Sequence, residues 1–350
     1  MHVSTVEPKT ENREPRTQKR EMKYSLIIPV YNRPDEVAEL LDSLTRIAFR
    51  DYEVILVEDG STLPCEAVAR QYGDRLSLRY FAKPNSGPGQ SRNYGAERAE
   101  GEWLIVLDSD ILVPEGYFDA LNSFLAHNDV DAFGGPDRAH ESFTPVQKAI
   151  NYGMTSFFTT GGIRGGKQKL DKFFPRSFNM GIRREVYHAL GGFRAMRFGE
   201  DIDFSYRIVE GGYRTALIPD AWVYHKRRTD FRKFFRQVHN SGIARVNLTI
   251  LHPGTLRLVH LLPSAFTIGC VLLLIGGCWW HWVWSLLACY ALLITVDSTL
   301  KNHSLRIGLL SVVAAFVQLT GYGTGFLVAA WRRWVLHKDN QDAFTQSFYK

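Results

Sequence analysis

Short apolar runs alternate with amphipathic stretches between residues 23 and about 250. Four of the apolar runs are typical of buried strands: YSLIIPVY (24–31), EVILVED (53–59), LSLRYFA (76–82) and EWLIVLD (102–108). The stretches 34–47 and 87–99 between them have the periodicity of helices. Strands that alternate with helices predict an α/β domain whose mostly parallel sheet has helices on both faces.

The hydropathy of the chain changes near residue 255. Three successive segments contain no Asp, Glu, Lys or Arg: 258–278, 279–296 and 307–331. Each is about long enough to cross a bilayer, and the tryptophans near their ends are typical of a membrane interface. A buried helical core is the alternative, but the tryptophans favour about three α-helical transmembrane segments within 257–335.

The basic residues around these segments conflict with three spans. If the N-terminal part is cytosolic, Lys301 and Arg306 fall on the cytosolic side, as the positive-inside rule requires. Three spans would place a second basic cluster outside: Arg332, Arg333 and Lys338. Either one segment is re-entrant, with GYGTG (321–325) as the candidate, or the rule does not hold here.

The pattern divides the chain into five parts. Residues 1–22 are charged and lack the apolar core of a signal peptide, so we expect a disordered tail. The other parts are an α/β domain (23–228), an amphipathic interfacial helix or linker (229–256), the membrane region (257–335) and a C-terminal tail (336–350). In the linker, basic residues recur with Phe231, Phe234 and Phe235, which is typical of a helix on an anionic membrane surface.

Composition and charge narrow the function classes. The 350 residues are 45% hydrophobic, which excludes a wholly disordered chain, and the net charge of +6 suits an anionic partner. Of the four cysteines, Cys65 lies in the polar part and the others in apolar stretches, so neither a disulfide framework nor a cysteine metal site is indicated. The chain has no GxGxxG after its first strand and no phosphate-binding GxxxxGK[ST] loop.

Polar residues follow the predicted strands. The residues in question are Asn32, Glu58, Asp59, Asp108 and Asp110. Because ligands bind open α/β sheets at the carboxyl ends of the strands, we expect these side chains to gather along one edge. Asp108 and Asp110 would repel each other unless a cation lies between them, and oxygen ligands favour Mg²⁺ or Mn²⁺. The alternative is that the pair only stabilises a turn.

Several ordered blocks resemble the inverting family 2 glycosyltransferases of the GT-A fold, over roughly residues 23–245. The blocks are SLIIPVYNRPDEVAELLDSL, VILVEDGST, NSGPGQSRNYGAERAEGEWLIVLDSDILVP, FNMGIRREVYHALGGFRAMRFGEDIDFSYRIVEGGYRTALIPDAWVYH and FFRQVHNSG. The resemblance implies a Rossmann-like catalytic domain that binds a nucleoside diphosphate sugar. It also implies roles for individual residues.

Five residues would bind the nucleotide by this resemblance. Pro29, Tyr31 and Asn32 would border it, Asp59 would accept a hydrogen bond from the base, and Arg92 would lie near the diphosphate and ribose. The usual pair of aspartates before the glycine is here a glutamate and an aspartate, which does not obviously impair base recognition.

Three residues would hold the metal. Asp110 would ligate Mg²⁺ or Mn²⁺, Asp108 would face the ribose or a metal-bound water, and His225 would approach the metal or the diphosphate. A surface histidine without a function is the alternative for His225. Basic residues between 226 and 236 would favour departure of the phosphate.

The segment FGEDIDFSYRI (198–208) would supply the general base. The resemblance assigns this role to Asp201, which would take the proton of the acceptor hydroxyl, and Glu200 would bind the acceptor or a basic group. A plain N-capping carboxylate is the alternative for Asp201. Asp203 should point elsewhere. We expect three residues of this helix to face the core: Ile202, Tyr206 and Val209.

These observations predict a metal-dependent inverting glycosyltransferase in the cytoplasmic (inner) membrane, multi-pass, with its catalytic domain facing the cytoplasm. The donor would be a nucleoside diphosphate sugar, with UDP favoured, and the acceptor a lipid-linked saccharide or a surface polysaccharide precursor. Membrane lipids are expected partners and nucleic acid is not. Transfer to polyprenyl phosphate and a non-catalytic nucleotide-binding membrane scaffold are the alternatives. The segment 158–170 is expected to be a mobile loop near the substrates, although a static loop is equally open.

Overall fold

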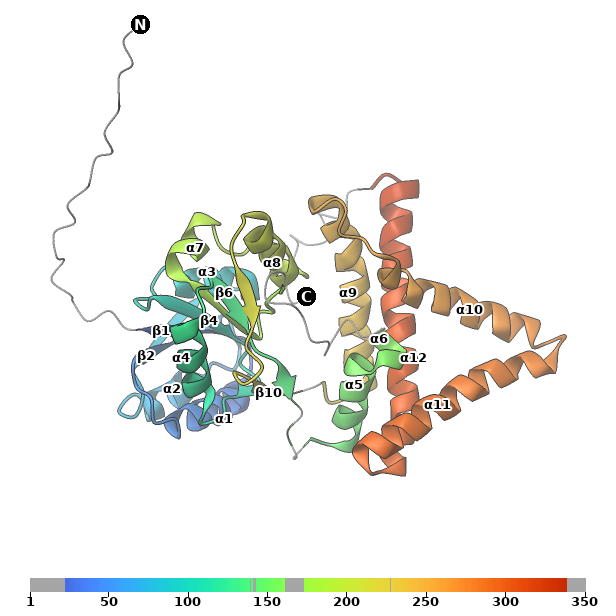
Figure 1. The fold of residues 1–350 in the computed structure, drawn as a ribbon, viewed down its shortest axis with the longest axis horizontal. Coiled ribbons are helices and arrows are strands. Elements are labelled where there is room, and N and C mark those ends of the chain that lie inside the picture. The colour runs from blue at the N-terminus through green and yellow to red at the C-terminus, as the bar shows by residue number, and fades with distance from the viewer. Residues whose placement is uncertain (1–22, 139, 141–142, 161–172, 227, 339–350) are drawn as a thin grey trace, which may run out of the picture.

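The computed structural model describes residues 23–138, 140, 143–160, 173–226 and 228–338. An α/β domain and a helical region lie side by side (Figure 1). The predicted N-terminal tail, residues 339–350 of the predicted C-terminal tail and residues 161–170 of the predicted mobile loop lie outside the described residues.

Within the described residues, seven strands form the main sheet in the order β3-β2-β1-β4-β8-β6-β9. Their bounds are β1 Tyr24–Val30, β2 Tyr52–Asp59, β3 Leu78–Lys83, β4 Trp103–Leu107, β6 Ala132–Gly134, β8 Asn179–Arg183 and β9 Thr215–Leu217. Only β8 runs antiparallel to its neighbours, β4 and β6, and the other described pairs are parallel. The prediction of a mostly parallel sheet is confirmed.

Helices cover both faces of this sheet. One face carries α1 (Pro34–Thr45), α2 (Glu66–Tyr72) and α4 (Tyr117–His127). The opposite face carries α3 (Pro88–Ala96), α7 (Arg184–Ala189) and α8 (Glu200–Glu210). Within β1, Leu26 and Ile28 pack on the first face and Ile27 on the second, because successive side chains of a strand point to opposite faces.

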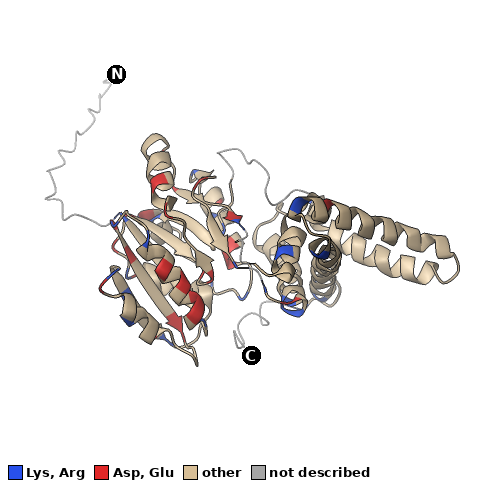
Figure 2. Ribbon diagram, turned by 90° about the horizontal axis from the view of Figure 1, so that it is seen from below, with Lys and Arg blue, Asp and Glu red and all other residues tan. Residues whose placement is uncertain are grey.

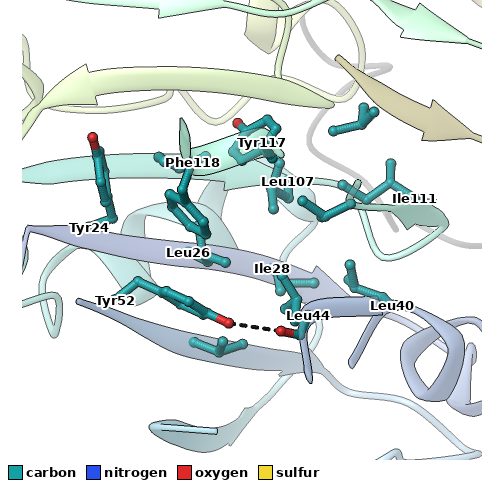
Figure 3. Packing of buried hydrophobic residues seen from close by; sticks show 14 of the residues in the cluster. Tyr24, Leu26, Ile28, Leu40, Leu44, Tyr52, Leu107, Ile111, Tyr117 and Phe118 are labelled. Atoms are coloured by element: carbon teal, nitrogen blue, oxygen red, sulfur yellow. Dashed lines mark hydrogen bonds between the residues drawn. The ribbon is translucent and has the colours of Figure 1, made fainter. Parts of the chain in front are cut away.

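Aromatic residues fill the core between β1, β2 and α4 (Figure 3). The Phe118 ring lies 5.2 Å from that of Tyr24 and 4.8 Å from that of Tyr52. The Tyr52 hydroxyl donates to the Leu44 carbonyl at 3.1 Å, so the polar end of a buried ring is satisfied. This packing lies at the N-terminal ends of β1 and β2, opposite the sheet edge where their polar residues lie.

A second sheet of three described strands lies beside that edge. Its strands are β5 (Ile111–Leu112), β10 (Val223–His225) and β7 (Asp137–Arg138), in that order. β10 pairs antiparallel with β5, and His225 lies opposite Ile111. This register brings the last predicted metal ligand next to the DSD motif, although the two are far apart in the sequence.

The helical region is built in layers. It contains α5 (Pro145–Thr155), α6 (Phe157–Thr160), α9 (Phe231–Leu251), α10 (Leu262–Gly276), α11 (Trp284–Asn302) and α12 (Leu305–Ala330), with short helices at Leu258–His260, His281–Val283 and Trp331–Val335. α9 lies between the α/β domain and α12, while α10 and α11 project from α12 as a hairpin on its far side (Figure 1).

The three predicted membrane segments are not equivalent in the structure. In the described residues, two helical stretches are long and apolar enough to cross a membrane, His281–Asn302 and Leu305–Val335, whereas α10 has 15 residues. The proposed re-entrant turn at GYGTG is wrong, because α12 passes through it as one helix. Its glycines allow close helix packing: a Cβ at Gly325 would lie 2.0 Å from the His239 carbonyl oxygen of α9.

Candidate active site

Asp108, Asp110 and His225 form a compact cluster at the sheet edge. His225 Nε2 lies 3.3 Å from Asp110 Oδ1 and 3.9 Å from Asp108 Oδ2. Arg33 donates to the other carboxylate oxygen of Asp110. Burial alone would raise the pKa of Asp110, but His225 and then Arg33 hold that pKa well below its usual range. Asp110 is therefore an ionised carboxylate at neutral pH.

This cluster fits a divalent metal ion. Each of the three side chains offers one ligand atom, and these atoms lie within 4.8 Å of one another. Two carboxylates and an imidazole are donors that divalent cations such as Mn²⁺ accept. Asp110 Oδ1 and His225 Nδ1 are buried without a hydrogen-bond partner among the described residues. The metal role of the cluster stays a prediction.

Arg92 joins the cluster to the start of α8. Its guanidinium donates to Asp108 Oδ1 and to Glu200 Oε1, both at 2.9 Å. Burial raises the pKa of Glu200 to about 7; Arg92 opposes this rise and the neighbouring Asp201 adds to it. One arginine shared by two carboxylates cannot fully compensate the burial of either. Glu200 thus contacts a basic group, which is one of the two alternatives stated for it in the sequence analysis.

Asp201 lies in the first turn of α8, where the helix dipole favours a negative charge. Arg176 Nε is 3.1 Å from Asp201 Oδ2. Gly199, with φ 84°, precedes the helix, and a Cβ there would meet Ala244 of α9 at 3.2 Å. The predicted base, Asp201, thus lies at the contact between the α/β domain and α9.

The predicted buried face of α8 is wrong. Ile202, Tyr206 and Val209 are only partly buried, whereas Phe204 and Ile208 are completely buried. The helix carries two apolar stripes, and sequence periodicity selected the wrong one. Asp203 is also buried, and it pairs with three residues instead of facing the acceptor side: Arg194, Arg207 and His252.

The predicted nucleotide residues lie at the same edge. The Asp59 carboxylate accepts hydrogen bonds from the backbone N–H groups of Ser86 and Gly87, at 2.9 and 2.8 Å, and from Lys83. It therefore holds the turn before α3, and its role in base recognition stays a prediction. Glu58 accepts a hydrogen bond from the Cys65 backbone N–H at 2.7 Å, so it orders the neighbouring loop.

Asn32 shapes the loop that follows β1. It has φ 53°, and its side-chain oxygen accepts hydrogen bonds from the backbone N–H groups of Thr62 and Leu63 at 2.8 and 2.9 Å. Pro29 is half-buried within β1, and Tyr31 is half-buried just after it. The role of these three residues at the border of the nucleotide stays a prediction.

A cavity of about 960 Å³ connects the two ends of the site. It is lined by Asn32, Asp110, Glu200 and Asp201 on the α/β side. On the other side it reaches residues of α9, α10 and α12: Gln237, Asn240, Arg245, Pro263, Leu319 and Tyr322. The predicted base and one predicted metal ligand therefore face one space, which extends to the apolar helices.

The cavity wall carries an excess of positive charge. Arg33, Arg176 and Lys226 pair with carboxylates. By contrast, among the described residues, no carboxylate lies within ion-pair distance of three lining arginines: Arg228, Arg236 and Arg245. Such a wall attracts a polyanion such as a diphosphate. Arg33 and Arg176 were missed by the sequence reasoning, because each acts through a contact and belongs to no recognised spacing.

The sequence matches known glycosyltransferases. Residues 25–191 match the family described as "Glycosyl transferase family 2". The chain is 27% identical over 229 residues to the minor teichoic acid biosynthesis protein GgaB of Bacillus subtilis, which covers 59% of this chain and 23% of that protein. It is also 37% identical over 93 residues to the poly(ribitol-phosphate) beta-N-acetylglucosaminyltransferase TarS of Staphylococcus aureus. This match covers 25% of this chain and 16% of TarS. The chain thus spans less than a quarter of either relative.

A solved structure shares the fold over nearly the whole chain. The mannosyltransferase PcManGT from Pyrobaculum calidifontis, in complex with GDP-Man and Mn²⁺, superposes with a TM-score of 0.62. The match covers 90% of this chain and 89% of that one at 17% sequence identity, so it bears on the fold alone. Together with the strand order, it confirms the expected GT-A-like α/β fold. The family match assigns residues 25–191 of this chain to the family 2 glycosyltransferases.

Proposed function

We propose that this enzyme transfers a sugar, with inversion, from a nucleoside diphosphate sugar to a hydroxyl of a lipid-linked saccharide or surface polysaccharide precursor. It does so while attached to the cytoplasmic face of the inner membrane. The observation that carries this proposal is the single cavity that contains Asp110 and Asp201 and continues to the apolar helices α10 and α12. Donor, base and lipid acceptor would thus share one space.

Asp108, Asp110 and His225 would hold Mg²⁺ or Mn²⁺ in this proposal. The bound ion would neutralise charge on the departing diphosphate. The unpaired arginines of the wall, Arg228 and Arg236, would add positive charge on the same side of the cavity. Arg92 would position Asp108 toward the ribose through its hydrogen bond, while Asn32 borders the nucleotide.

Asp201 would act as the general base. Inversion requires a carboxylate to accept the hydroxyl proton as the acceptor oxygen attacks C1 of the sugar from the side opposite the leaving group. It lies at the positive end of α8 and beside Arg176. Glu200 would hold Arg92 and border the acceptor.

The names of similar proteins support a polymer or cell-surface acceptor. GgaB is named for teichoic acid biosynthesis, and TarS for transfer of N-acetylglucosamine to poly(ribitol-phosphate). PcManGT was solved with GDP-Man and Mn²⁺, which supports a nucleotide sugar and a divalent ion. For this chain we propose UDP as the carrier, and a lipid-linked acceptor because the cavity opens toward the apolar helices.

Polyprenyl phosphate is the second candidate acceptor. The unpaired arginines of the cavity would suit its phosphate. A phosphate is already an anion and needs no base, however, so a carboxylate at Asp201 would be superfluous. A non-catalytic nucleotide-binding scaffold would not need Asp201 as a base.

A donor screen tests the proposal. Detergent extract is incubated with Mn²⁺, membrane lipids and UDP-, GDP- or dTDP-sugars, and the released nucleoside diphosphate and the label in each lipid fraction are measured. We expect one donor class to be used, with inversion at C1 in the product. Asp201→Asn should lower kcat by about 10²- to 10⁴-fold, with little change in donor KM.

The matched control is Asp119→Asn, which changes an exposed carboxylate of α4. It should retain the activity of the unmodified enzyme. Equal turnover by Asp201→Asn and the unmodified enzyme would overturn the base assignment. Absence of turnover with every donor, in a protein that still binds nucleotide, would favour the scaffold.

A further inference from the structure

The α10–α11 hairpin concentrates apolar surface at one end of the molecule. No Asp, Glu, Lys or Arg occurs from Leu258 to Val296. At its tip four tryptophans are 48–70% exposed: Trp279, Trp280, Trp282 and Trp284. Figure 2 shows the hairpin without charged residues, extending away from the α/β domain. Charge returns only at its base, where Asp297 of α11 pairs with Lys301 at 2.8 Å.

α12 is equally apolar, but it lies against protein. Its Gly321 faces Val238 of α9, where a Cβ would lie 2.5 Å from the valine side chain. Gly242 of α9 in turn approaches the Tyr322 carbonyl so closely that a Cβ would lie 2.2 Å from its oxygen. At the other end of α12, Ala314 packs against Gly153 of α5. The middle of α12 is thus covered by helices that belong to the catalytic side.

Those covering helices could not lie in hydrocarbon. Along its contact with α12, α9 carries Arg236 and Arg245, which line the same cavity as Asp201. α8 packs on α9 from the other side, through Gly199 and Ala244. Placing a charged side chain at the bilayer centre is unfavourable, so such residues are rare in lipid-facing helices. If α12 spanned the bilayer, the middle of α9 and the start of α8 would have to enter it.

We propose that only the α10–α11 hairpin enters the membrane, and that α12 lies along the cytosolic interface between the hairpin and the catalytic domain. Both ends of the hairpin, and both ends of α12, are then on the same side as the catalytic domain. This inference rests on the membrane location in the proposed function, but it replaces three spans by one inserted hairpin.

This arrangement removes the conflict between the positions of the basic residues and the positive-inside rule. With α12 at the interface, all the basic residues that flank α11 and α12 lie on the cytosolic side: Lys301, Arg306, Arg332, Arg333 and Lys338. This satisfies the positive-inside rule and places them near anionic headgroups. The side of α12 away from α9 exposes Leu309 and Val313 by 56% and 45%, which suits contact with the membrane interface.

Cysteine labelling tests this topology. In full-length chains without the native cysteines, Lys301→Cys and Lys338→Cys each introduce one thiol, before and after α12. Asp119→Cys marks the side of the catalytic domain. A membrane-impermeant maleimide is applied to right-side-out and inside-out vesicles from cells that express the protein. We expect all three thiols to be labelled in the same vesicles and protected in the others, with at least a tenfold difference.

Labelling of Lys338→Cys on the side opposite to Asp119→Cys would overturn the proposal and restore a spanning α12. A reporter fused after Lys350 of the unmodified chain repeats the test without substitutions. The reporter is a phosphatase that is active only outside the cytoplasm, and we expect the fused phosphatase to be inactive. Phosphatase activity of the fusion would overturn the proposal. If carbonate released the chain from the vesicles, the membrane location in the proposed function would itself be wrong. Donor turnover in extract is independent of every outcome.

Discussion

The α/β domain and the helical region use the same apolar residue types in different ways. In the α/β domain, apolar positions locate the core: Leu26, Ile27 and Ile28 are completely buried. In α10, Leu272 and Ile275 are 62% and 51% exposed. α12 lies between these cases: it packs against α9 and α5, whereas its Leu309 and Val313 are 56% and 45% exposed. Hydropathy therefore shows that a segment avoids water. Only the contacts of a helix show whether it packs against protein or faces lipid.

The largest expected effect comes from breaking the contact between α9, which borders the α/β domain, and α12. Gly242→Ala would place a methyl group against the backbone of α12, so we expect it to lower the free energy of unfolding by about 1–3 kcal/mol. Thermal unfolding of the detergent-solubilised chain measures this change. Transfer activity should fall as well, because α9 forms one wall of the cavity.

Gly269→Ala is the matched control in α10. A Cβ at Gly269 meets nothing within 4 Å, and alanine favours a helix over glycine by about 0.5–1 kcal/mol. The control should be neutral or slightly stabilising. If both variants melted at the temperature of the unmodified chain, α9 and α12 would not be packed as described.

Sequence periodicity was sufficient for much of the α/β domain. Strand ends are set by local pattern, so Asp108 and Asp110 could be placed at the sheet edge before any contact was known. His225 required the family resemblance, because its position depends on antiparallel pairing with β5. The metal-binding role of Asp108, Asp110 and His225 remains a prediction, as does the role of Asp201 as the base.

Contacts between distant side chains could not be predicted from spacing. Arg33 at Asp110 and Arg176 at Asp201 depend on loop conformations that no local rule determines. In the helical region, the glycines of GYGTG are typical of a turn in isolation. They lie within a helix because the packing of α9 requires small residues there. Tertiary contact overrode local propensity in each case.

A smaller effect is expected in the pH dependence of stability, where Glu200, the buried carboxylate at the start of α8, should differ from surface carboxylates. The pKa of Glu200 is raised from 4.5 to about 7, so the folded state keeps its proton to higher pH than the unfolded state. Its contribution to stability is full below pH 4.5 and is lost as pH rises through about 7. The loss should reach about 1.4 kcal/mol per pH unit at its steepest. Glu200→Gln should remove this decline, as melting curves between pH 4.5 and 8 would show.

Glu115→Gln serves as the control for that series. Glu115 is exposed, so its substitution should leave the pH dependence of melting unchanged. If Glu200→Gln and the unmodified chain lost stability in parallel across this range, Glu200 would be an ordinary ionised carboxylate.

Manganese binding tests the site most directly. Free Mn²⁺ is titrated by electron paramagnetic resonance into the unmodified chain, Asp110→Asn and Asp201→Asn, each with UDP present. We expect the unmodified chain and Asp201→Asn to bind one Mn²⁺ with equal affinity, and Asp110→Asn to bind it at least about tenfold more weakly. Binding by Asp110→Asn as tight as that of the unmodified chain would contradict a metal held by Asp108, Asp110 and His225.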